Sequence, residues 1–66
     1  MKIFEFKVYF STGDKENITG HIDYENQSVI LYENKSRHWT HKGLIPFTAI
    51  KKLEILKLKA EWDEGD

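Results

Sequence analysis

The sequence contains no cysteine, a single proline, four glycines and no long apolar run. Without cysteine, neither a disulfide nor a thiolate metal site can add to the stability of a chain of 66 residues. A chain this short buries a modest fraction of its unfolded surface, so we expect a small core, no deep catalytic cleft and no enzymatic activity. Charges also interrupt the apolar residues after Met1, which argues against a signal peptide or a membrane span. We therefore expect a cytoplasmic protein without a membrane partner.

The near-neutral formal charge of -1 hides an uneven distribution along the chain. Residues 1–60 hold all ten lysines and arginines but seven of the eleven acidic residues, and the other four acidic residues lie within residues 61–66. Segments of opposite sign attract each other. We predict one small β domain over residues 1–60, followed by a flexible acidic tail over residues 61–66. One hypothesis is that this tail covers a basic loop of its own chain.

Alternating apolar residues mark the N-terminal half as a series of strands. Residues 2–10 carry aromatic or β-branched residues at every second position, which is typical of a half-buried strand. Turn-forming residues at 11–16 lead to a second alternating run, so the two segments are predicted to form a hairpin. Gly20 interrupts the second run, and a glycine inside a strand indicates a bulge, a bend or close backbone approach. Residues 28–32 add a third strand to the meander.

The segment from Glu33 to Gly43 is polar and irregular, and we interpret it as a long loop or a splayed hairpin. An extended pattern resumes at Leu44 to Phe47. Pro46 cannot donate a backbone hydrogen bond, which favours the edge of a sheet for this segment.

Residues 48–60 are compatible with two structures. Thr48 could cap a helix that continues to Trp62, and the alanine, leucine, lysine and glutamate content favours helix. Against this, Leu53 with Ile55 and Leu56 with Leu58 form two alternating pairs that are out of phase by one residue, as in a strand with a bulge. We favour the strand. The predicted fold is all-β, a small, strongly bent antiparallel sheet or half-open barrel of about five strands, and the alternative is a β-meander followed by a C-terminal helix.

The polar segment carries the candidate binding site. Cations attract phosphates, and an exposed indole can stack on a base, so a basic segment with a tryptophan favours contact with single-stranded nucleic acid or RNA. The candidate residues are Lys35, Arg37, His38, Trp39 and Lys42. We predict a non-enzymatic binding module that uses them.

Two other functions remain open. The edge at Leu44 to Phe47 could pair with a strand of a protein partner or of a second subunit, as in a homo-oligomer. His38 and His41, with His21 as a third ligand, could hold a metal ion, although two nearby histidines are weak evidence for a metal-dependent site. No catalytic constellation, glycine-rich phosphate loop or cofactor motif is present in the sequence, so we predict no catalytic residue, no resident metal and no cofactor.

Several features resemble the Sm-like fold, a bent, half-open, five-stranded barrel related to SH3-like modules. They are Gly20 in the second strand, the turn at 23–26, the strand at 29–32 and the closing segment at 44–50. The similarity covers roughly residues 6–56 and is a pattern of apolar spacing. It implies a small barrel and a tendency to form oligomers.

Overall fold

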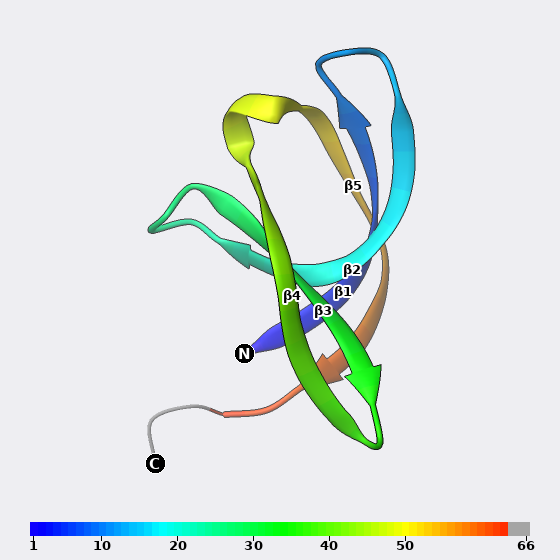
Figure 1. Cartoon of the computed structure of the whole chain (residues 1–66), viewed down its shortest axis with the longest axis vertical. Coiled ribbons are helices and arrows are strands. Elements are labelled where there is room, and N and C mark those ends of the chain that lie inside the picture. The colour runs from blue at the N-terminus through cyan, green and yellow to red at the C-terminus, as the bar shows by residue number, and fades with distance from the viewer. Residues whose placement is uncertain (64–66) are drawn as a thin grey trace.

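The computed structural model describes residues 1–63 and shows one open sheet of five antiparallel strands (Figure 1). The all-β prediction is therefore confirmed, and the alternative with a C-terminal helix is wrong, because residues 50–61 form a strand. No helix within residues 1–63 has the length and apolar character needed to cross a membrane. The elements are β1 (Lys2–Phe10), β2 (Lys15–Asp23), β3 (Ser28–Lys35), β4 (His38–Pro46), the 3-10 turn η1 (Phe47–Ala49) and β5 (Ile50–Glu61).

The first four strands form a meander, and β5 returns to pair with β1, which gives the order β4-β3-β2-β1-β5. This order leaves β4 and β5 as the two edges of the sheet. The edge position predicted from Pro46 is confirmed, since β4 pairs with β3 alone.

Gly20 lies where β2 passes from one partner to the next. β2 pairs with β1 from Lys15 to Gly20 and with β3 from Gly20 to Asp23. A Cβ atom at this position would overlap the backbone oxygen of Ile30. The close backbone approach predicted for this glycine is confirmed, and it lets β2 bend sharply while it keeps both neighbours (Figure 1).

The polar segment from Glu33 to Gly43 is a hairpin whose two strands pair closely. Of the two interpretations given for it, the long loop is wrong and the hairpin is confirmed, although its strands are not splayed. Ser36 and Arg37 alone connect β3 to β4, and both have positive φ angles, 50° and 68°. The end of β3 and the start of β4 were not identified as strands because this part of the hairpin is exposed and lacks the apolar alternation of a half-buried strand. The turn also lacks the Asn-Gly or Asp-Gly pair that marks such two-residue connections.

The core is small. Its fully buried apolar side chains among the described residues are Phe6, Val8 and Val29, which form one cluster, and Ile3, which lies outside it. Each contributes about 1.5–3 kcal/mol through burial. Half-buried side chains surround the cluster, with contributions from η1 and from four of the five strands: Phe4, Phe10, Ile18, Ile22, Leu31, Phe47, Ile50 and Leu53.

Strand β5 contains the predicted bulge. Its register with β1 shifts at three places, one of which skips Leu56, and this explains why the two apolar pairs of the sequence are out of phase. β5 also extends past the boundary predicted after residue 60. Glu61 belongs to the strand and its carboxylate lies 3.6 Å from the Lys2 ammonium, and the Trp62 N–H donates to the Met1 carbonyl at 3.0 Å. Residues 64–66 of the predicted tail lie outside the described residues.

Candidate functional site

The five predicted binding residues lie along the hairpin of β3 and β4, but the structure divides them into two groups. The exposed end of the hairpin carries three of them. Lys35 extends into solvent with its ammonium 3.5 Å from the Glu33 carboxylate, Arg37 lies in the turn, and His38 pairs with Lys35 across the ladder. An exposed ion pair of this kind contributes little to stability, so Lys35 and Glu33 are free to exchange partners.

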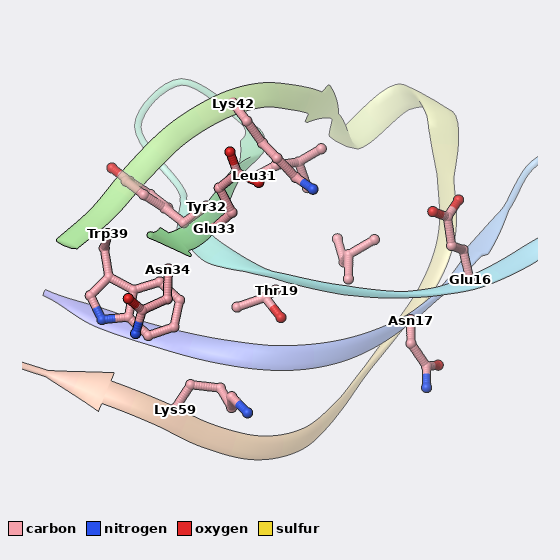
Figure 2. Close-up of a pocket in the computed structure, with 11 residues that line it drawn as sticks. Glu16, Asn17, Thr19, Leu31, Tyr32, Glu33, Asn34, Trp39, Lys42 and Lys59 are labelled. Atoms are coloured by element: carbon pink, nitrogen blue, oxygen red, sulfur yellow. The ribbon is translucent and has the colours of Figure 1, made fainter. Parts of the chain in front are cut away.

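The other two, Trp39 and Lys42, line a groove of about 410 Å³ between the hairpin and the rest of the sheet (Figure 2). We call it the hairpin groove. The groove exists because the pairing of β2 with β3 ends at Gly20 and Leu31. Residues 15–19 of β2 and residues 32–35 of β3 are therefore not paired with each other. Sequence reasoning missed Lys59 of β5, which faces the groove from the opposite side, and Tyr32 of β3.

The contents of the hairpin groove are mixed. Trp39 pairs with Asn34 across the ladder, and Figure 2 shows the two side chains next to each other on the side of the groove toward Lys59. Lys42 and Lys59 are balanced by two acidic lining residues, Glu16 and Glu33, so the groove has aromatic and hydrogen-bonding groups but no net charge. Such a lining can stack a flat ring and bind its polar edge, but it attracts polyanions weakly.

The histidines do not converge. Tyr32 faces His41 across the ladder and Lys35 faces His38, which places the two imidazoles on opposite sides of β4. His41 lies 6.1 Å from the Tyr32 ring, centroid to centroid, and its Nε2 donates to the Gly43 carbonyl at 3.0 Å. The His21 Nδ1 donates to the Lys2 carbonyl on another strand, at 3.1 Å. Within residues 1–63, no three possible ligands are grouped to hold a metal ion.

A second hollow lies at the other end of the sheet and was not predicted. This apolar groove, of about 370 Å³, is lined by apolar and aromatic side chains alone. Tyr24 at its rim is 75% exposed, and Ile55 is 55% exposed. The lining residues come from β2 and the turn after it, η1 and β5: Ile22, Tyr24, Phe47, Ile50, Leu53 and Ile55.

Hydrogen bonds in the turn between β2 and β3 fix the rim of the apolar groove. The Asp23 carboxylate accepts hydrogen bonds from the Asn26 side-chain amide at 2.8 Å and from the Asn26 backbone N–H at 3.1 Å. These bonds hold the pKa of Asp23 below its ordinary value, because they stabilise the charged form. The Phe47 N–H donates to the Gln27 carbonyl at 2.9 Å, which ties η1 to the same turn. Tyr24 and Phe47 then meet edge to face, with ring centroids 6.3 Å apart.

Exposed apolar side chains continue from this groove along β5. Leu56 and Leu58 are each nearly half exposed, on a strand whose outer edge has no partner among the described residues. The sequence did contain a signal for this surface. The two out-of-phase pairs, Leu53 with Ile55 and Leu56 with Leu58, place more apolar residues on this strand than one sheet face can bury.

Comparisons with protein-family models, curated proteins and solved structures found no match to this chain. The class that the structure defines is a small all-β protein with one open, bent, five-stranded antiparallel sheet.

Proposed function

We propose that this protein is a non-enzymatic binding module whose apolar groove holds a segment of another polypeptide. The observation that carries the proposal is the exposure of Tyr24 and Ile55 at a hollow whose lining residues are all aliphatic or aromatic. An exposed apolar patch beside a formed groove is typical of a surface that binds a protein.

The energetics favour one segment that covers several of these side chains together. Burial contributes about 25 cal/mol per Å² of apolar surface, and this must exceed the entropy lost when two molecules associate. The apolar surface of a single isoleucine is too small for its burial to exceed this entropy cost. A chain segment that enters the groove and continues along Leu56 and Leu58 would cover a continuous apolar surface on one strand.

A peptide selection tests this proposal directly. Random peptides displayed on phage should enrich on the wild-type protein for apolar sequences, and Ile55→Lys should abolish the enrichment because it places a charge at the groove. Leu44→Lys is the matched control, since Leu44 is 57% exposed but lies on β4 outside the groove. No enrichment, or equal enrichment on the Ile55→Lys protein, would contradict the proposal.

A second candidate function is the one predicted from the sequence, contact with single-stranded nucleic acid or RNA at the hairpin. It is supported by Trp39 lying in one groove with Lys42 and Lys59. An indole in the same groove as two lysines can stack on a base while the lysines contact the flanking phosphates. Lys35, Arg37 and His38 at the exposed end of the hairpin would extend this contact.

Fluorescence anisotropy with a labelled single-stranded RNA tests the second candidate. Trp39→Ala should weaken binding about tenfold or more, since one stacked base contributes about 1–3 kcal/mol. Affinity should also fall steeply as salt is added. Trp62→Ala is the matched control because Trp62 lies outside the hairpin groove. Absence of binding at low salt would remove this candidate.

We also propose that this chain is related to the Sm-like and SH3-like barrels and that it is located in the cytoplasm. The bend at Gly20 and the final strand that returns to β1 support the relationship. It would favour oligomers, which agrees with a surface that binds polypeptide.

A further inference from the structure

The face of the sheet opposite the core carries lysines around one aromatic ring. Val8 of β1 is buried in the core, so its neighbours in the strand, Lys7 and Tyr9, lie on the other face. Tyr9 is directly opposite Lys15 of β2 and Lys52 of β5 in the register. Directly opposite residues share a face, so three lysines from three adjacent strands lie around one ring. We call these four residues the lysine cluster.

The Tyr9 ring positions two of the three lysines. The Lys7 and Lys52 ammonium nitrogens lie over the ring, 5.9 and 5.3 Å from its centroid. A cation in this position is attracted by the ring electrons, which limits the conformations of both long side chains. Less entropy is then lost when the two lysines bind a ligand. The same contacts cover the ring with positive charge, so the cluster suits a phosphate better than a stacked base.

The positive charge of the lysine cluster is not balanced by its surroundings. The ion pairs within residues 1–63 involve Lys2 and Lys35, so no lysine of the cluster is in an ion pair. Glu54 is opposite Lys7 in the register, and the Asp14 carboxylate accepts a hydrogen bond within its own turn. Positive charge therefore remains in excess. Because like charges at close range repel each other, a ligand with negative charge stabilises this arrangement.

The lysine cluster adjoins the hairpin groove. Asn17, which lines that groove, is directly opposite Lys7 in the register. Figure 2 shows Asn17 and Glu16 on opposite sides of β2, so the lining of the groove reaches the face that carries the cluster. The two surfaces complement each other. The groove contains Trp39 for stacking but no net charge, and the cluster contains positive charge but no ring that is open to stacking.

Resting on the second candidate function, we propose that the lysine cluster binds the phosphates of a single-stranded nucleic acid whose bases occupy the hairpin groove. Successive phosphates carry negative charge along an extended path, which fits lysines on three adjacent strands. The Cα atoms of Lys15 and Lys52 are two strand spacings apart, about 10 Å. An anionic membrane surface fits less well, because the ring of the cluster lies under its lysines and cannot insert.

Two double variants of equal net charge test the proposal with the labelled single-stranded RNA of the hairpin experiment. Lys7→Gln/Lys52→Gln removes two lysines of the cluster, and Lys2→Gln/Lys57→Gln removes two exposed lysines outside it. The first variant should weaken RNA binding about tenfold or more. It should also reduce the slope of log affinity against log salt by about 1.4, since each phosphate contact of a single strand contributes about 0.7. The second variant should bind within about twofold of the wild type, because it keeps these phosphate contacts.

Variants of Tyr9 test whether the ring positions the lysines. Tyr9→Leu should weaken RNA binding about two- to fivefold, whereas Tyr9→Phe keeps the ring and should bind like the wild type. Circular dichroism confirms that each variant is folded before it is compared.

Three results would overturn the inference. They are equal RNA affinities of the two double variants, a Tyr9→Leu protein that binds RNA like the wild type, and unchanged RNA affinity of Lys7→Gln/Lys52→Gln together with lost binding to phosphatidylserine vesicles. In each case, weaker RNA binding by Trp39→Ala would leave the second candidate function intact. Absence of RNA binding at low salt would remove both, so the two failures are distinguishable.

Discussion

The hairpin groove and the apolar groove both extend from β2 to β5, at opposite ends of the two strands. In the hairpin groove, charges of both signs surround Trp39 and Tyr32. In the apolar groove, every lining residue is apolar or aromatic. The difference arises at Gly20, since β2 contributes residues 16–19 to the first groove and Ile22 to the second. One bend in one strand therefore creates two surfaces of different chemistry.

Local sequence composition and exposed apolar area therefore point to different functions for the two grooves. In the sequence, the basic and aromatic residues of the hairpin lie close together, between Lys35 and Lys42. Its groove nevertheless has no net charge, because Glu16 and Glu33 enter it beside the two lysines. The apolar groove has no sequence cluster at all, yet it exposes more apolar side chain.

The largest expected effect comes from the bend that both grooves share. Gly20→Val should lower the free energy of unfolding by more than about 3 kcal/mol, because its Cβ would overlap the rigid backbone at Ile30. Urea unfolding measures this change. Gly43→Ala is the control, since a Cβ there would lie 3.7 Å from the Leu31 Cδ1, an ordinary contact, and should cost less than about 1 kcal/mol. Equal effects at both glycines would contradict the role assigned to the bend.

A smaller, stabilising effect is expected at the turn of the hairpin. Arg37 has a φ angle of 68°, which glycine adopts without strain, so Arg37→Gly should raise the free energy of unfolding by about 0.5–1 kcal/mol. Arg37→Ala removes the same charge without relieving the backbone and should not stabilise the protein. Thermal unfolding of the two variants separates backbone strain from charge, and both should reduce RNA affinity equally if Arg37 acts through its charge.

The smallest expected effect is a pH dependence at the rim of the apolar groove. Hydrogen bonds from Asn26 lower the pKa of Asp23 in the folded protein. The resulting stabilisation is complete above the unfolded pKa, near the ordinary value of 3.8, and is lost as pH falls through the lower folded pKa. Unfolding measured from about pH 6 to pH 2 should therefore show a weaker acid dependence for Asn26→Ala than for the wild type. An unchanged dependence would show that Asn26 does not set this pKa.

Much of the fold was predictable from the sequence. Alternation identified β1 and β2, Gly20 marked the close approach and Pro46 marked an edge strand. Residues 48–60 were harder, because alanine, leucine and lysine favour helix locally, whereas pairing with β1 determines the strand. The sequence could not decide between a loop and a hairpin for residues 33–43, because the end of the hairpin faces solvent and its turn residues, Ser36 and Arg37, are not typical of such turns.

The sites were less predictable than the fold. Two of the candidate residues, Trp39 and Lys42, line one groove. Lys59 joins them there only through the pairing of β5 with β1, which contains three register shifts. A one-residue shift moves every later side chain to the other face, so such contacts cannot be read from spacing. The apolar groove likewise requires Ile22, Phe47 and Ile55 to meet from separate elements.

Backbone NMR spectra recorded while an apolar peptide from the phage selection is added compare the two regions in a single experiment. If the apolar groove binds a polypeptide segment, the amide signals of Tyr24, Phe47 and Ile55 should shift or broaden as the peptide is added. The signals of Arg37 and Trp39 in the hairpin should stay constant. Constant signals at the apolar groove, or changes confined to the hairpin, would contradict the claim that the apolar groove is the binding surface.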